Sequence, residues 1–185
     1  SNPDVPVVVV FQLNYWVQVL LRFTKAPEKG YVHKVGDVKT LHHDKARGLV
    51  QQAKAAMSDN GMRPDCFVMR TQHVCNPKRC ENHDMKLKLS SEIDFEKDEP
   101  ECCHFDELVR LLNDNIREVA KEFDVPLFDW AATVDGKLND AGSNPWMLEK
   151  CHQTLEASMT MKIAFDEFIE ANLPAHCFGG GGGGN

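Results

Sequence analysis

Glycine is scarce in most of this 185-residue chain, because six of its twelve glycines form one C-terminal run, residues 179–184. The other six do not form a loop that could surround a phosphate, which argues against dinucleotide-binding and Walker-type motifs. A glycine run has no side chains to bury, so residues 179–185 are predicted to form a flexible tail.

Long apolar runs and an excess of positive charge are also missing. The longest apolar stretch, residues 5–13, is interrupted by Pro6 and Gln12. It is much shorter than the roughly 20 residues that span a bilayer. The net charge is −7, with both signs scattered along the chain. We therefore expect neither a membrane span nor a nucleic-acid partner.

Cysteine, in contrast, is plentiful. The chain has seven cysteines, an odd number that leaves one thiol unpaired if the others form disulfides. This count favours the secretory route, whereas the absence of any Asn-x-Ser/Thr sequon argues against it, so the compartment stays open between extracellular and cytoplasmic. Cys66, inside an apolar segment, is expected to belong to the core.

The apolar pattern predicts alternating strands and helices. Residues 7–14, 66–70 and 125–130 have the composition of buried strands. Helices are predicted from an N-cap at Asp44 to a stop at Asn60 and Gly61, over residues 105–123, and from about 155 to 173. This β-α-β-α-β-α order predicts the α/β class, with a parallel sheet between two helical layers.

We interpret residues 1–178 as one domain, interrupted by a long loop rich in Cys and His at residues 72–100. Three strands make a narrow sheet, so the domain is expected to be incomplete on its N-terminal side. The exposed sheet edge suggests that other protein chains are partners.

Polar residues after each strand are the first candidates for a site, because ligands of open α/β sheets bind beyond the carboxyl ends of the strands. After the first two strands these are Asn14, Arg70, Thr71 and His73. After the third they are Asp129, Glu149 and His152.

Two of these positions resemble conserved blocks of the SGNH (GDSL-like) hydrolases. Residues 7–14 resemble the Gly-x-Asn-Asp block that ends a Val-rich strand, with Gln12 in place of Gly and Tyr15 in place of Asp. Glu149-Lys-Cys-His152 resembles the Asp-x-x-His block before the last helix. The resemblance covers most of residues 5–173 and implies an SGNH-like three-layer α/β fold.

The same resemblance implies acyl-ester chemistry. His152 corresponds to the general base, Glu149 to the residue that orients it, and Asn14 to the oxyanion donor. No serine of the chain stands in a Gly-Asp-Ser setting, so the nucleophile lies in another part of the protein, is supplied by another chain, or has been lost together with catalysis. The alternatives to these catalytic roles are a solvated Glu149–His152 pair and an Asn14 side chain that caps a loop.

Residues 69–73 are similar to the Arg-Thr-x-x-x-His stretch of the PC-esterase-like branch, which acts on acyl groups of glycans. This similarity implies that Arg70, Thr71 and His73 bind substrate, an acylated carbohydrate. From the residues alone, the structural interpretation of Arg70 and Thr71 is favoured.

The Cys/His-rich loop offers a third interpretation. His73, Cys75, Cys80 and His83 are four zinc-type ligands within eleven residues, although their spacing matches no standard zinc finger. A Cys75–Cys80 disulfide and free thiols are the competing interpretations. The sequence thus leaves three functions open: an acyl esterase or acyltransferase without a required cofactor, a non-catalytic SGNH-like interaction module, and a zinc-stabilised binding domain.

Overall fold

A computed structural model describes residues 7–12, 33–73, 92–93, 106–137, 145–147 and 153–178. Its central sheet contains β1 (Val9–Phe11), β3 (Phe67–Arg70) and β5 (Leu127–Phe128) in the order β1-β3-β5. β3 pairs in parallel with both neighbours. The predicted α/β class and parallel sheet are therefore confirmed.

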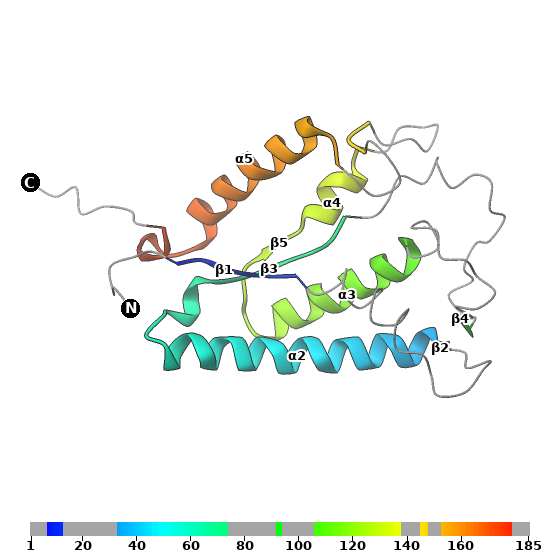
Figure 1. The fold of residues 1–185 in the computed structure, drawn as a ribbon, viewed down its shortest axis with the longest axis horizontal. Helices are drawn as coiled ribbons and strands as arrows, with labels where there is room; N and C mark the ends of the chain where they lie inside the picture. Colours follow the sequence, from blue (N-terminus) through cyan, green and yellow to red (C-terminus); the bar gives the residue numbers. More distant parts are fainter. Residues whose placement is uncertain are drawn as a thin grey trace, which may run out of the picture.

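Helices cover both faces of this sheet (Figure 1). On one face lie α2 (Val35–Asp59) and α3 (Asp106–Glu122), and on the other lies α5 (Leu155–Asn172). The short helix α4 (Trp130–Asp135) follows β5 directly. The result is the predicted α/β/α arrangement of three layers.

Four smaller elements also lie in the described part of the chain. The 3₁₀ turn η1 (Pro64–Cys66) precedes β3, and η4 (Ala175–Cys177) follows α5. β2 (His33–Lys34) pairs antiparallel with β4 (Glu92–Ile93). β4 falls within the predicted loop 72–100, most of which lies outside the described residues.

The core is built around β3 and α3. Phe67, Val68 and Met69 are almost completely buried, as expected for a strand with helices on both faces. From α3, Ile116 and Val119 are fully buried at helical spacing. The predicted helix over residues 105–123 is confirmed, since its apolar period gave the buried face directly.

The predicted start of α2 at Asp44 is wrong, because the helix begins nine residues earlier, at Val35. Val38, His42 and Ala46 are buried along one side of this extra length. The buried polar residue interrupts the apolar pattern and so conceals it. The predicted stop is confirmed: Gly61 has φ +70°, and the Met62 amide donates to the Met57 carbonyl (2.8 Å), which closes the helix end.

Of the predicted strand 125–130 and the predicted helix 155–173, only the strand ends at a different place in the structure. The predicted strand 125–130 ends early, because the Asp129 side chain accepts a hydrogen bond from the Ala132 amide and starts α4 at Trp130. The predicted helix 155–173 is confirmed as α5, capped by the Thr154 hydroxyl, which accepts from the Ala157 amide (3.1 Å).

A disulfide joins Cys66 in η1 to Cys177 in η4, with Cα atoms 5.3 Å apart and a sequence separation of 111. Cys66 is buried, as expected, but as half of a cross-link. The bond ties the start of the central strand to the turn that follows α5. None of the described helices combines the length and the hydrophobicity needed to cross a membrane.

A buried histidine joins α2 to α3. The Asn115 side-chain nitrogen donates to the Lys39 carbonyl (2.8 Å) and lies 3.1 Å from His42 Nδ1. An amide nitrogen only donates, so Nδ1 accepts and the ring is neutral. Burial, with a smaller contribution from His43, lowers the pKa of His42 from 6.5 to about 4.

This lowered pKa predicts a loss of stability in mild acid. The unfolded chain takes up a proton on His42 below pH 6.5, whereas the folded chain does not until about pH 4. Stability due to the neutral ring is therefore complete above pH 6.5 and falls as the pH drops, by about 2 kcal/mol between pH 7 and pH 5. Urea unfolding at both pH values measures it.

His42→Gln should lose about 2 kcal/mol less than the native chain over that interval. The control is His43→Gln, whose ring is partly exposed beside Asp44 and Glu118. Because His43 makes only the smaller contribution to the lowered pKa of His42, this variant should keep most of the native pH dependence. Equal pH dependence in the native chain and His42→Gln would show that other groups cause the loss.

Candidate functional site at the carboxyl edge of the sheet

The strands of the central sheet end at one common edge. Phe11 of β1 lies opposite Met69, and Arg70 of β3 lies opposite Phe128. The residues that follow β3 and β5 therefore emerge side by side, at the edge where open α/β sheets bind ligands.

A hydrogen-bond network fixes this edge between β3 and β5. The Thr71 hydroxyl donates to Asp129 Oδ1 (2.8 Å) and accepts from the Ala131 amide (3.0 Å). Arg117 of α3 donates to both oxygens of Asp129, from Nε (2.8 Å) and Nη2 (3.0 Å). Because its hydroxyl is engaged in both directions and is buried, Thr71 has the contacts of a structural residue.

Asp129 is held in its charged form. Partial burial raises its pKa, but hydrogen bonds from Arg117, Thr71 and the Ala132 amide outweigh burial and bring the pKa below its usual value. The carboxylate is thus an anchor for two strands and two helices. The sequence predicts Asp129 at a strand end. No sequence pattern indicates a role for Arg117, which directly follows the buried Ile116 of α3.

Arg70 brings a positive charge to the same edge. Its Nη2 donates to the sulfur of Met161 on α5 (3.0 Å), and burial lowers the pKa of its guanidinium. Within the described part of the chain, the buried Nε atom has no hydrogen-bond partner. A guanidinium stays protonated and has five donors, so Arg70 has donor capacity left for a ligand.

The chain beyond β3 is clamped to α3. The Gln72 amide donates to Asn113 Oδ1 (3.0 Å), and Asn113 Nδ2 donates to the Gln72 carbonyl (2.7 Å). His73 follows this clamp and is partly buried. Of the four predicted zinc ligands, His73 alone lies in the described part of the chain.

An aromatic stack connects the edge to the residues before α5. Trp130, directly after Asp129, stacks on Trp146 with ring centroids 5.7 Å apart. The Thr154 amide donates to the Trp146 carbonyl (2.8 Å), and Met147 forms an antiparallel bridge with Gln153. The described residues on both sides of segment 148–152 are therefore bridged to each other and anchored next to Asp129.

The remaining predicted site residues lie outside the described residues. Three of them were predicted for catalysis, namely Asn14, Glu149 and His152. The other three were predicted as zinc ligands, namely Cys75, Cys80 and His83. Their roles stay predictions. The Trp130–Trp146 stack was missed at the sequence level, because a contact between distant aromatic residues leaves no periodic signal.

Comparison with known proteins identifies the fold. No family model matches this chain, and no curated protein matches it in sequence. Its structure is similar to the crystal structure of a GDSL-like lipase from Bacteroides thetaiotaomicron, with a TM-score of 0.51 and 12% sequence identity. The match covers 91% of this chain and 64% of the lipase, so the chain spans just under two thirds of the lipase's length. The chain has an SGNH-like α/β fold.

Replacing Asp129 by Asn tests the anchor. Asp129→Asn removes the charge that holds Arg117, and we expect the free energy of unfolding to fall by about 1–3 kcal/mol at pH 7. Because the folded-state pKa is lowered, this stabilisation is present above the unfolded value of 3.8 and is lost as the pH falls through the folded value. Urea unfolding at pH 7 and pH 3 measures both effects.

The matched control is Asp166→Asn, which removes the exposed pair with Lys162 on α5. It should change stability by less than about 0.5 kcal/mol. A difference between native chain and Asp129→Asn that stays the same at pH 3 would contradict the lowered pKa.

Proposed function

We propose that this chain is the part of an SGNH-like acyl esterase or acyltransferase that carries the general base. His152 is the base, Glu149 orients its ring, and Asn14 donates to the oxyanion. The nucleophilic serine comes from a segment outside these 185 residues. The supporting observation is the anchoring of residues 146–147 and 153–154 beside Asp129, because segment 148–152 between them includes Glu149 and His152.

The proposed chemistry is that of a serine esterase. His152 takes the proton of the serine hydroxyl as its oxygen attacks the ester carbonyl, and the Asn14 amide donates to the oxygen that becomes negative. His152 then gives the proton to the leaving alcohol, and water or a second alcohol releases the acyl group from the serine. Glu149 keeps the proton on the other ring nitrogen, so that the nitrogen facing the serine accepts.

The proposed substrate, an acyl ester of a glycan, is supported by the resemblance of residues 69–73 and by the guanidinium of Arg70. The resemblance of this stretch to the PC-esterase-like branch supports an acyl ester on a glycan, a point to which the structural neighbour adds nothing. The partly buried Arg70 guanidinium donates a hydrogen bond to Met161 within the described part of the chain, and its other donors suit a sugar oxygen or a carboxylate. Thr71 then shapes the edge through Asp129, and His73 is a further candidate contact.

The native protein that carries this chain tests the base. We expect it to hydrolyse p-nitrophenyl acetate and an acetylated oligosaccharide, and to react with a fluorophosphonate serine probe. His152→Gln should lower kcat by about 10⁴–10⁶-fold with little change in KM, because the base acts in the transition state.

His43→Gln, a change in a partly exposed histidine of α2, should leave kcat unchanged. Full activity in His152→Gln would assign the base to another residue. A native protein that neither hydrolyses these esters nor reacts with the probe would favour the non-catalytic function.

Arg70→Met tests substrate binding separately from chemistry. Loss of a charged hydrogen bond of about 1.5–3 kcal/mol should raise KM for the acetylated oligosaccharide by about 10–100-fold and leave KM for p-nitrophenyl acetate nearly unchanged. Arg47→Met, which removes an exposed arginine paired with Glu122, is the control. Equal changes in KM for both esters would contradict a contact between Arg70 and the sugar.

One observation favours the alternative of an SGNH-like interaction module. Leu155, Met159 and Ile163 lie at four-residue spacing on α5 and are 75%, 58% and 57% exposed. An exposed apolar stripe of this kind is typical of a surface that another protein covers. Binding of a partner chain without esterase activity is the result that would favour this function.

A further inference from the structure

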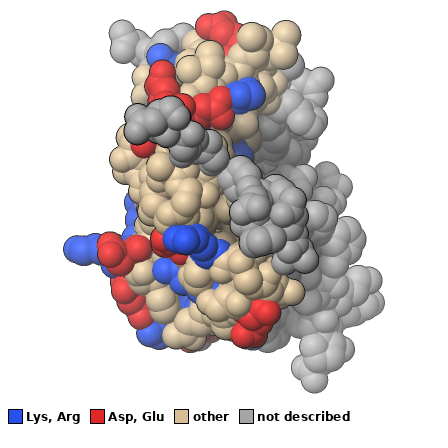
Figure 2. All heavy atoms as spheres, turned by 90° about the vertical axis from the view of Figure 1, so that its left-hand side faces the viewer, with Lys and Arg blue, Asp and Glu red and all other residues tan. Residues whose placement is uncertain are grey.

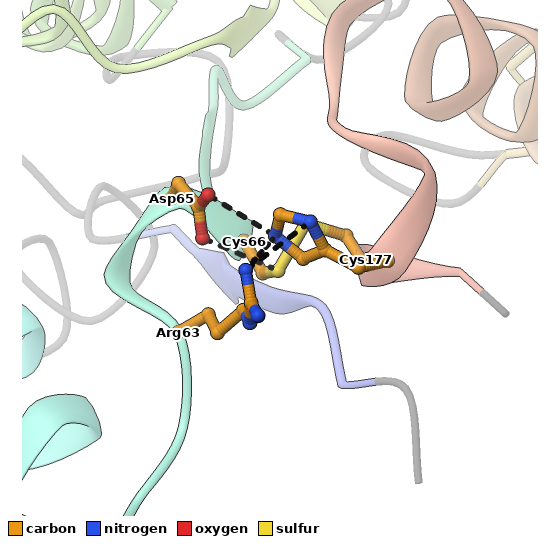
Figure 3. The surroundings of a disulfide bond; sticks show 5 residues. Arg63, Asp65, Cys66 and Cys177 are labelled. Atoms are coloured by element: carbon orange, nitrogen blue, oxygen red, sulfur yellow. Dashed lines mark hydrogen bonds and ion pairs between the residues drawn. A yellow bond between two sulfur atoms is a disulfide. The ribbon is translucent and has the colours of Figure 1, made fainter. Parts of the chain in front are cut away.

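The turns η1 and η4 are far apart in sequence but lie next to each other. They are at the end of the molecule that faces the viewer in Figure 2. On that face, basic and acidic side chains are interspersed. The meeting point contains four side chains with metal-ligand chemistry, which we call the η1–η4 cluster (Figure 3). It consists of Asp65, Cys66, His176 and Cys177.

The donor atoms of the η1–η4 cluster are close together. His176 Nε2 lies 3.1 Å from Asp65 Oδ2, and Cys66 Sγ lies 3.8 Å from Asp65 Oδ1. All four donor atoms are within 4.8 Å of one another. Zinc bonds of about 2.0–2.3 Å in a tetrahedron place donors roughly 3.3–3.8 Å apart, so, once the S–S bond is broken, the two sulfurs have to move apart and the other donors have to shift by about 1 Å to complete the geometry.

We propose that the η1–η4 cluster binds Zn²⁺ when the disulfide is reduced. A disulfide sulfur is not a zinc ligand, whereas a thiolate is. A trialkylphosphine, for example, gives two electrons to the S–S bond and becomes a phosphine oxide with oxygen from water, leaving two thiols. Zn²⁺ then displaces the two thiol protons and binds both sulfurs, the imidazole and the carboxylate.

Burial and charge both support such a site. Cys66 and Cys177 are buried, while the side chains of Asp65 and His176 are 51% and 34% exposed, so an ion can reach the sulfurs from the solvent side. Two thiolates and one carboxylate would leave the zinc complex with one net negative charge. The Arg63 guanidinium, with Nη1 3.4 Å from both ring nitrogens of His176, neutralises that charge.

The zinc ion and the disulfide would hold the same two segments together. Leu173 and Cys177 are buried after α5, so the cross-link attaches this end of α5 to the start of β3. Oxidised protein has a covalent cross-link, and reduced protein with zinc has a coordinate one. Reduced protein without metal has neither and should be the least stable of the three. This inference does not depend on the proposed esterase function.

Zinc titration of the full chain tests the site, with a chromophoric chelator as competitor and a trialkylphosphine as reductant. Reduced chain should bind one zinc ion more than oxidised chain, and zinc should raise its unfolding temperature. His176→Gln should weaken that binding by at least about 10-fold, and Cys66→Ser with Cys177→Ser should abolish it. His176 is exposed, so its variant keeps the test valid if the double variant fails to fold.

Cys75→Ser with Cys80→Ser is the matched control, because it removes the other predicted pair of zinc-binding cysteines. It should keep the zinc ion that depends on His176. If reduced chain binds no additional zinc, or if His176→Gln binds it unchanged, the proposal is wrong. Loss of this zinc ion in the control would place it in the Cys/His-rich loop instead and would equally overturn the proposal.

Discussion

The contact on which the carboxyl edge depends is the set of hydrogen bonds to Asp129. Parallel strands leave their carboxyl ends side by side, but they do not fix the loops that follow. The Asp129 carboxylate does this by accepting from Thr71 and Arg117 and by starting α4. Trp130 is thereby fixed in position to stack on Trp146, which anchors the chain before α5.

Helix α5 is attached to the sheet at both ends. At its start, the Thr154 amide is bonded to the Trp146 carbonyl, and after its end, Cys177 is bonded to Cys66. Between these points, Phe165 and Phe168 contact Phe128 of β5 with ring centroids 5.1 and 5.4 Å apart. Both attachments lie on segments that the sequence alone does not connect, and the first of them holds the residues before α5 at the carboxyl edge.

Local patterns predicted the elements well where burial followed a simple period. The buried face of α3, the extent of α5 and the glycine that ends α2 were readable, because each depends on residues a few positions apart. The start of α2 was not, because the buried His42 looks polar in sequence and acquires its role only against Asn115 of α3. The predicted base and oxyanion residues came from resemblance, and Asn14, Glu149 and His152 lie outside the described residues.

The α/β class, the order of strands and helices and the positions of polar residues after strands can be predicted from the residues alone, since alternation and helical period are local properties of the chain. Tertiary structure alone decided which of these residues meet. Thr71 and Arg117 lie on different elements from Asp129, and Cys66 and Cys177 have a sequence separation of 111. Such contacts depend on how the layers pack, and packing distance does not follow from distance along the chain.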